Sequence, residues 1–508
     1  MATREIALPS PNRAFERLLL AAGIAVALAL AGLLLVFGGP DGNLFAPVGF
    51  FAALLVVPLV LRRPVVGLYL LMAAAVIIET DALTFGFGAT AQVPFFRDLN
   101  SITGLRGMWV NPAELMLLLT FAAWLLRDGA GDRINFKPAP LMLPLALFFA
   151  AVAFGILHGL VTGGDAKIAL WTVRPLAYFG IAYALTTQTL TDRRQVNVLI
   201  WLFIIGAALK GIIGLWRYYV DMGGNLNALN SVEGMNSLMA HEESFFYLGV
   251  ILLAVVQILY GAPRGQKLAA LAASGIVLLP FLANQRRAGT LALMVGLALL
   301  CVVTLSMLPS RRGAMLGIVA LAAAVLPFYV AMSWNADNLT GEPVRAVKSG
   351  ISPESRDLLS NEYRDAENMN LEFTVRSSPL VGIGFGKEMI MKWPMPDISD
   401  QFAWYRLAPH NSILWLMMTI GISGFIVFWY FIGSAVVRAL VLARRLPDRV
   451  DKGIAVYGVL MLAATLVFAL LDQGLLSMRS LLFLGILLGA VFALPRLAGE
   501  ADERGRES

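Results

Sequence analysis

Pro409-His410-Asn411 is the part of this 508-residue chain best suited to proton transfer. It lies where a long polar segment, 334–409, meets an apolar stretch that begins at Ser412. Histidine exchanges a proton near neutral pH more readily than other side chains, and the chain contains only three. A histidine at this boundary indicates a general base at a membrane surface, although a histidine that merely caps a helix start would fit the same position.

Other side chains could share this proton transfer. Asn411 is expected to cap the following helix or to orient the imidazole. Glu242 and Glu243, at the end of another apolar stretch, are rival bases, and the adjacent His241 could also be recruited. His158, late in its own apolar stretch, is expected to pack there or to lie at the membrane interface.

A double arginine lies in a very short polar turn, Asn284-Gln285-Arg286-Arg287, between two apolar stretches. Arginine keeps its charge, and its planar group makes paired hydrogen bonds to phosphate oxygens. The turn therefore predicts an anion-binding site, although two side chains that snorkel toward water would also explain it.

Composition indicates that these groups are positioned by a membrane bundle. The chain is 58% hydrophobic and 14% charged, with a mean hydropathy of +0.75, whereas a soluble protein carries roughly 25% charged residues. Many apolar runs approach the ~20 residues that cross a bilayer, which predicts an all-α, polytopic membrane protein. About fourteen spans are expected, near 15–37, 46–61, 64–79, 112–127, 139–161, 169–188, 195–217, 242–260, 268–283, 288–308, 313–333, 411–437, 453–471 and 475–494.

Several function classes are disfavoured. The net charge of +6 is spread through short connectors and does not indicate nucleic-acid binding. Cys301 is the only cysteine, which excludes a disulfide framework and a cysteine-rich metal site. The sequence contains no Walker-type glycine–lysine motif, so ATP hydrolysis is not indicated. The first apolar stretch lacks a small-residue cleavage site and is expected to be a retained helix.

Basic connectors alternate along the chain and set the expected orientation. With the N-terminus in the cytoplasm, every dense basic connector falls on the cytoplasmic side, and so does the C-terminus. Three longer connectors, 80–111, 218–241 and 334–409, then lie outside. The chain divides into a membrane bundle over 1–333, a large outer loop over 334–409, and the last spans with a cytoplasmic tail over 410–508.

Two patterns stand out within the large outer loop. Residues 353–376 are predicted to form an amphipathic helix, because apolar residues from Leu359 to Phe373 recur every three or four positions. This helix is expected to lie apolar face down across the mouth of the bundle, or simply to close the loop at the surface. Alternating glycines in 379–386 allow tight turns and close approach of the backbone to a ligand.

Five motifs follow one another around this loop: Asn284-Gln285-Arg286-Arg287-Ala288-Gly289, Glu362-Tyr363-Arg364, Ser378-Pro379-Leu380-Val381-Gly382-Ile383-Gly384-Phe385-Gly386, Pro409-His410-Asn411-Ser412 and Gly421-Ile422-Ser423-Gly424. In this order they resemble the O-antigen ligase/polymerase superfamily of bacterial membrane glycosyltransferases. The resemblance is strongest over about 280–430. Upstream it rests mainly on the multi-span architecture and on Arg174-Pro175-Leu176.

The resemblance implies a GT-C-like fold and a role in envelope or exopolysaccharide biosynthesis in the cytoplasmic membrane. The donor would be an undecaprenyl-diphosphate-linked glycan, and the acceptor a growing glycan, lipid A–core or protein on the periplasmic side. No nucleotide sugar, cofactor or bound metal is implied. Membrane lipids and polysaccharide-assembly proteins are the expected partners. Whether the protein is a ligase or a polymerase stays open.

The same resemblance suggests a role for each candidate residue. His410 would be the general base for the acceptor hydroxyl, with Glu242 as its rival; such help is worth typically 10²–10⁴ in rate. Arg286 and Arg287, followed by Arg364, would bind the diphosphate. Arg174 is a further candidate, because a cation inside a span is costly and tends to be functional or paired.

One feature departs from the family pattern: residues 222–240 contain no arginine or lysine. A phosphate contact expected there would be lost, or supplied by Arg217 or Arg174. Arg217 is otherwise expected at the membrane interface. Asp472 and Arg479, seven residues apart, are expected to form a buried ion pair.

Two other classes of protein remain open. A transporter or flippase of lipid-linked oligosaccharides would also need many spans and a charged cavity, but it predicts inverted repeats and broken helices near the bilayer midplane. No repeat is visible. An inactive structural partner in envelope assembly is the third reading.

Overall fold

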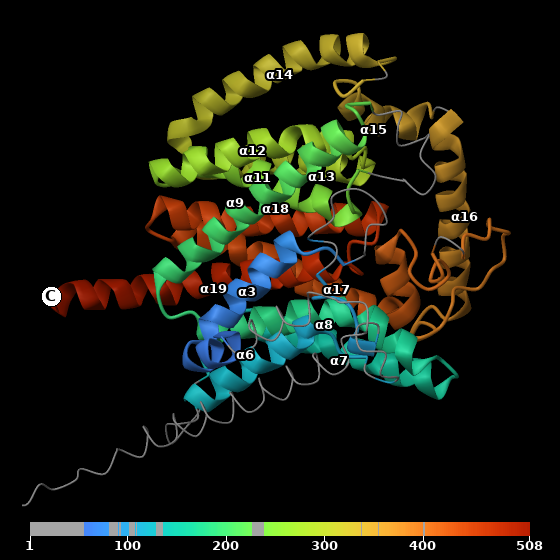
Figure 1. Cartoon of the computed structure of the whole chain (residues 1–508), viewed down its shortest axis with the longest axis horizontal. Coiled ribbons are helices and arrows are strands. Elements are labelled where there is room, and N and C mark those ends of the chain that lie inside the picture. The colour runs from blue at the N-terminus through green and yellow to red at the C-terminus, as the bar shows by residue number, and fades with distance from the viewer. Residues whose placement is uncertain are drawn as a thin grey trace, which may run out of the picture.

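The computed structural model describes residues 55–80, 90, 93–100, 107, 109–128, 136–225, 238–336, 338–353, 355–399 and 402–507. Within these residues the regular elements are helices, and no strand occurs (Figure 1). This confirms the all-α prediction for the described part of the chain.

Most helices are long and pack side by side in one bundle (Figure 1). Their bounds are α3 (Pro64–Ile77), α6 (Pro112–Asp128), α7 (Met142–Val161), α8 (Ala166–Thr189), α9 (Arg193–Trp216), η1 (Arg217–Asp221), α11 (His241–Tyr260), α12 (Arg264–Ala283), α13 (Arg287–Met307), η2 (Pro309–Arg311), α14 (Arg312–Ser333), α15 (Glu342–Ile351), α16 (Ser355–Ser377), α17 (Ser412–Arg445), α18 (Arg449–Leu471) and α19 (Met478–Glu507).

Ten helices of the described residues are long and apolar enough to cross a membrane, so the chain is a multi-pass membrane protein. Helices α3 and α6 match two further predicted spans, but they have 14 and 17 residues, short of the ~20 that cross a bilayer. The predicted span 15–37 and most of 46–61 lie outside the described residues.

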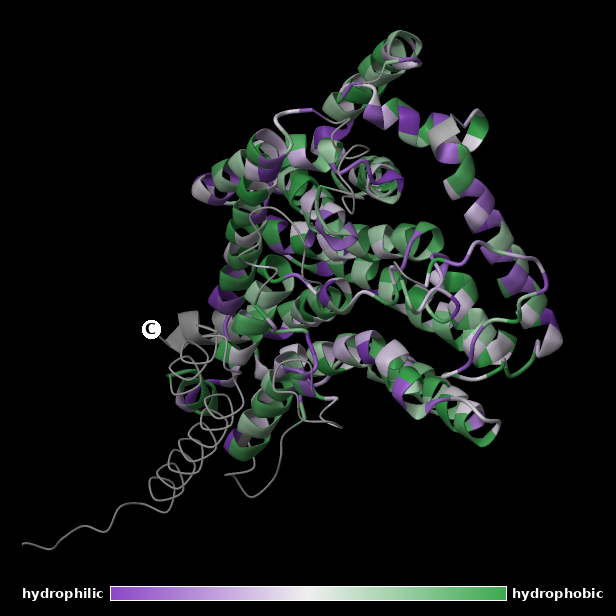
Figure 2. Cartoon of the chain, turned by 45° about the vertical axis from the view of Figure 1, so that its right-hand side comes forward, coloured by the Kyte–Doolittle hydropathy of each residue, from purple (hydrophilic) through white to green (hydrophobic). Residues whose placement is uncertain are grey.

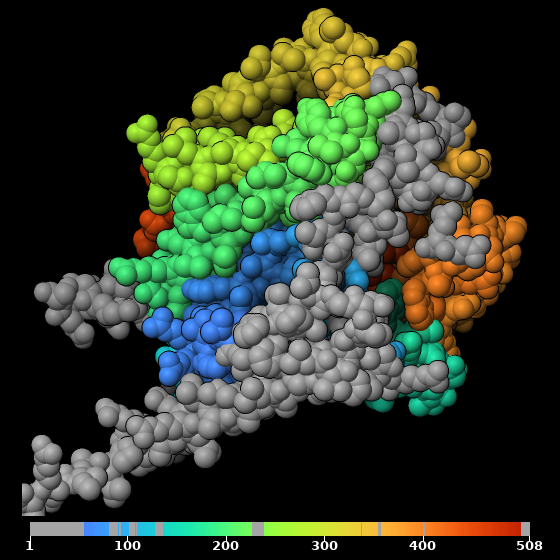
Figure 3. Space-filling view, in the orientation of Figure 1, coloured from blue at the N-terminus to red at the C-terminus, as the bar shows by residue number. Residues whose placement is uncertain are grey.

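Burial differs sharply across the bundle. In α19, 83% of the apolar window is buried inside the protein, against 6% in α14. Helix α14 stands along one edge of the bundle (Figures 1 and 3), where its apolar side chains suit contact with lipid. Figure 2 shows mainly hydrophobic helices in the bundle and a more hydrophilic α16 at one end.

Residues 379–386 enter the bundle between α7 and α17. Gly382, Gly384 and Gly386 have φ of 72°, 86° and 84°, a backbone region that glycine adopts at little cost. A Cβ atom on Gly384 would lie 2.3 Å from the backbone of Gly159 on α7. The alternating glycines therefore allow close approach to a helix of the same chain.

Helix α17 is interrupted where this segment meets it. Gly421 has φ of 65° and ψ of −179°, outside the helical region. The backbone N–H groups of Ile383 and Gly384 donate to the carbonyls of Met418 and Thr419, at 2.8 and 3.1 Å. Carbonyls near the break in α17 thus gain partners from the inserted loop, which is what a buried helix interruption requires.

The predicted amphipathic helix corresponds to α16, whereas α15 was not expected. The expectation that its apolar face points down is wrong for Leu359 and Met369, which are 75% and 41% exposed. The buried residues of α16 include the polar Glu367 and Asn370 as well as Leu371. Asn370 accepts from the backbone N–H groups of Lys392 and Trp393, so Asn370 is buried with hydrogen-bond partners.

Candidate functional site

The start of α17 fixes the position of His410. Asn411 is the N-cap: its Oδ1 accepts from the backbone N–H of Leu414 at 3.1 Å, and its Nδ2 donates to Asn368 on α16 at 3.2 Å. The Ser412 hydroxyl donates to the carbonyl of Ala469, at the end of α18, at 3.0 Å. The Asn411 amide and the Ser412 hydroxyl therefore fix the preceding residue, His410, between α16 and α18.

Glu367 of α16 contacts both the backbone and the imidazole ring of His410. Its Oε2 accepts from the His410 backbone N–H at 2.9 Å, and both carboxylate oxygens lie 3.3 Å from Nδ1. The Glu367 side chain is 1% exposed and that of His410 is 26% exposed. A carboxylate at Nδ1 favours the proton on that nitrogen and leaves Nε2 free to accept one.

Tyr363 forms the adjoining wall of this site. Its ring meets the His410 ring edge to face, with centroids 5.9 Å apart. Burial, reinforced by the Glu367 carboxylate, raises the pKa of the Tyr363 phenol. Its buried hydroxyl has no hydrogen-bond partner among the described residues, so a substrate group could satisfy it.

Asp472 contacts a second histidine, His241, and is also an electrostatic neighbour of His410. Its Oδ2 lies 2.8 Å from Nδ1 of His241, and its side chain is 7% exposed. Burial by itself would raise the pKa of the Asp472 carboxyl. The neighbouring His241, Arg286 and His410 together outweigh burial and hold this pKa well below its ordinary value. Asp472 therefore stays ionised. The predicted Asp472–Arg479 pair is wrong, because Arg479 pairs with Glu243 at 2.6 Å and with Glu242 at 3.1 Å.

The guanidinium groups of Arg286 and Arg364 form no ion pair and no side-chain hydrogen bond within the described part of the chain. Burial lowers the pKa of Arg286, Asp472 opposes this, and Arg364 adds to the lowering. Nε of Arg286 is buried without a hydrogen-bond partner among the described residues. Arg364 is a like charge near Arg286, and an anion bound near both would relieve their repulsion.

Arg287 is committed to the fold. Its guanidinium donates to Asn361 Oδ1 at 2.7 Å and to Ser360 Oγ at 3.1 Å. It therefore ties the start of α13 to α16, the helix that carries Arg364 and Glu367.

Glu242 belongs to a buried ion network. It accepts from the hydroxyls of Ser477 at 2.6 Å and Thr80 at 3.0 Å and pairs with Arg479. Lys210, fully buried, contacts Glu79 and Glu243. All of these partners belong to the bundle, so the Glu242 carboxylate is part of a structural network.

Two further cations are buried against carboxylates. Arg217 is 1% exposed and lies 3.9 Å from Glu79, and its expected position at the membrane interface stays a prediction. Arg174 pairs with Asp98 and with Glu114, each at 2.7 Å. Its charge is thus matched by two carboxylates. His158 stacks on Phe154 of the same helix, outside this cluster.

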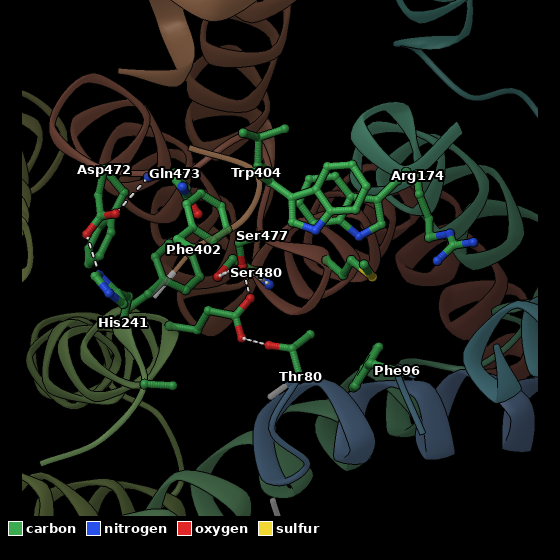
Figure 4. Close-up of a pocket in the computed structure, with 18 of the residues that line it drawn as sticks. Thr80, Phe96, Arg174, His241, Phe402, Trp404, Asp472, Gln473, Ser477 and Ser480 are labelled. Atoms are coloured by element: carbon green, nitrogen blue, oxygen red, sulfur yellow. Dashed lines mark hydrogen bonds and ion pairs between the residues drawn. The ribbon is translucent and has the colours of Figure 1, made fainter. Parts of the chain in front are cut away.

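A cavity of about 640 Å³ opens beside Asp472. Figure 4 shows His241 and Asp472 at one end and Arg174 at the other, with aromatic rings between them. Nε2 of Gln473, on the same wall, donates to the carbonyl of Ala408 at 2.6 Å, two residues before His410. The aromatic lining consists of Phe96, Trp171, Phe245, Phe402, Trp404 and Phe468.

Residues 268–429 match a protein-family model described as O-antigen ligase. The matched region runs from α12 into α17 and contains Arg286, Arg287, Arg364 and His410. The predicted resemblance to the O-antigen ligase superfamily is therefore confirmed over this region. No curated protein matches the chain.

Proposed function

We propose that this protein moves a glycan from an undecaprenyl-diphosphate carrier to an acceptor hydroxyl at the outer face of the bacterial cytoplasmic membrane. The observation that supports the proposal is an oriented histidine, His410 on Glu367, that shares the neighbour Asp472 with Arg286. Arg286 and the nearby Arg364 form no ion pair within the described residues. The match to the O-antigen ligase family supports a membrane enzyme of this general kind.

The chemistry follows from these groups. Nε2 of His410 accepts the proton of the acceptor hydroxyl as its oxygen bonds to the anomeric carbon of the donor. The bond between that carbon and the diphosphate oxygen breaks, and its electron pair leaves with the diphosphate. Arg286 and Arg364 bind the leaving group, whose negative charge grows as the bond breaks.

The test is transfer by purified, reconstituted protein supplied with lipid-linked glycan and acceptor. We expect His410→Ala to lower the transfer rate about 10²- to 10⁴-fold, while His158→Ala, a matched histidine outside the cluster, stays near wild type. Arg286→Ala should lower kcat/KM for the donor about 10- to 100-fold, and the exposed control Arg376→Ala should not. Unchanged transfer in both His410→Ala and Arg286→Ala would sink the proposal.

The same preparation separates the transferase from a flippase. A flippase moves lipid-linked glycan between leaflets and leaves the glycosidic bond to the diphosphate intact. A transferase breaks that bond in detergent, where no second leaflet exists.

A further inference from the structure

The cavity beside Asp472 differs in charge from the surroundings of Arg286 and Arg364, which are called the arginine cluster below. Arg174, at its far end, is matched by Asp98 and Glu114. Three carboxylates, Asp98, Glu242 and Asp472, and one further arginine, Arg97, also lie on its wall. A diphosphate placed here would meet these carboxylates. Asp472 is also near Arg286, but neither Arg286 nor Arg364 forms an ion pair within the described residues. The cavity therefore suits a neutral group.

Its walls also have the chemistry of a sugar site. Trp171 and Trp404 stack on each other with ring centroids 5.3 Å apart, and both are half-buried at the cavity wall. An aromatic face is electron-rich and attracts polarised hydrogens, such as the C–H groups on one face of a pyranose. Hydroxyls on the edge of such a ring would meet His241, Asp472 and Gln473, which accept or donate hydrogen bonds.

We propose that this aromatic cavity binds a neutral pyranose ring of the acceptor. The inference rests on the proposed function, since it needs a reaction that consumes an acceptor hydroxyl. Two hydrogen bonds place the cavity beside His410. Asp472 lines the cavity and its backbone carbonyl accepts from the Ser412 hydroxyl at 3.3 Å, and Gln473, on the same wall, donates to the carbonyl of Ala408 at 2.6 Å.

Binding is measured by saturation-transfer NMR on the full-length protein in detergent, with methyl glucoside, methyl galactoside and methyl mannoside as probes. We expect transfer to the ring C–H protons of at least one glycoside. Trp404→Ala should reduce it at least fivefold, and Trp404→Phe, which keeps an aromatic face, should reduce it less. Trp429→Ala, which removes an exposed indole on α17, should leave it unchanged.

Three results would overturn the inference: no saturation transfer in wild type, equal transfer in Trp404→Ala, or displacement of the sugar by polyprenol, which would mean that the cavity holds lipid. Phe402→Ala gives a second test should Trp404→Ala fail to fold. Binding should persist in His410→Ala and Arg286→Ala. Because sugar binding needs no chemistry, it can fail while transfer succeeds, or succeed while transfer fails.

Kinetics assign the sugar to the acceptor. In a working transfer assay, Trp404→Ala should raise KM for the acceptor about tenfold, the effect of losing ~1.4 kcal/mol of binding, and leave KM for the donor unchanged. A raised KM for the donor alone would place the donor glycan in the cavity and contradict the proposal.

Discussion

At the scale of residues, the site depends on partners that are far apart in sequence. His410 and the arginines could be singled out because a histidine at a polar–apolar boundary and paired arginines in a short turn are unusual in a membrane chain. Glu367 could not be singled out in this way, because it lies 43 positions from His410. In the sequence it looks like the partner of Arg364 in an ion pair along one helix. Only the packing of α16 on the start of α17 gives it its role.

Glu367→Gln tests that role. The amide cannot supply the charge-assisted hydrogen bond that holds Nδ1–H, so we expect kcat to fall about 10- to 100-fold while KM for the donor changes little. Glu372→Gln, on the same helix but in an exposed pair with Arg376, is the matched control. Equal rates for the two variants would show that Glu367 does not position the imidazole.

At the scale of elements, hydropathy predicted most helices but not how the loop enters the bundle. Long apolar runs define α7 through α14 and α17 through α19, because length and apolar composition are what a bilayer demands. The glycines of 379–386 were expected to approach a ligand. They pack instead on α7 and on the interrupted α17, a contact between segments that no local pattern encodes.

Gly384→Ala tests this insertion. The new Cβ would lie 2.3 Å from the Gly159 backbone, on a residue whose φ is 86°. We therefore expect the free energy of unfolding to fall by about 1–3 kcal/mol and the thermal midpoint in detergent to fall with it. Gly433→Ala, on α17 with open space around it, should be neutral or slightly stabilising. A Gly384→Ala midpoint equal to that of Gly433→Ala would contradict the packing.

At the scale of the whole molecule, the multi-pass bundle was predictable, whereas its interior charges were not. Arg217 and Lys210 are both buried against Glu79, a pairing that joins residues more than 100 positions apart in the sequence. Helices α15 and α16 lie at one end of the bundle (Figure 1), beside the arginine cluster. Because basic connectors favour the cytoplasm, we expect this end to face outward.

Cysteine labelling in intact cells tests the orientation. In a Cys301→Ser background, Arg376→Cys on α16 should react with a membrane-impermeant maleimide, and Arg444→Cys at the end of α17 should react only after the cells are opened. Both positions are exposed, so accessibility within the protein does not bias the comparison. The reverse pattern would place the site in the cytoplasm.

The central claim is that His410 transfers a proton while Arg286 and Arg364 hold a departing lipid diphosphate. Its most direct measurement is the stoichiometry of products from purified protein, with lipid-linked glycan and acceptor as the only substrates. We expect one free undecaprenyl diphosphate for each glycosylated acceptor, with both products lost together in His410→Ala. Glycosylated acceptor without free diphosphate carrier, or equal product from His410→Ala and wild type, would contradict it.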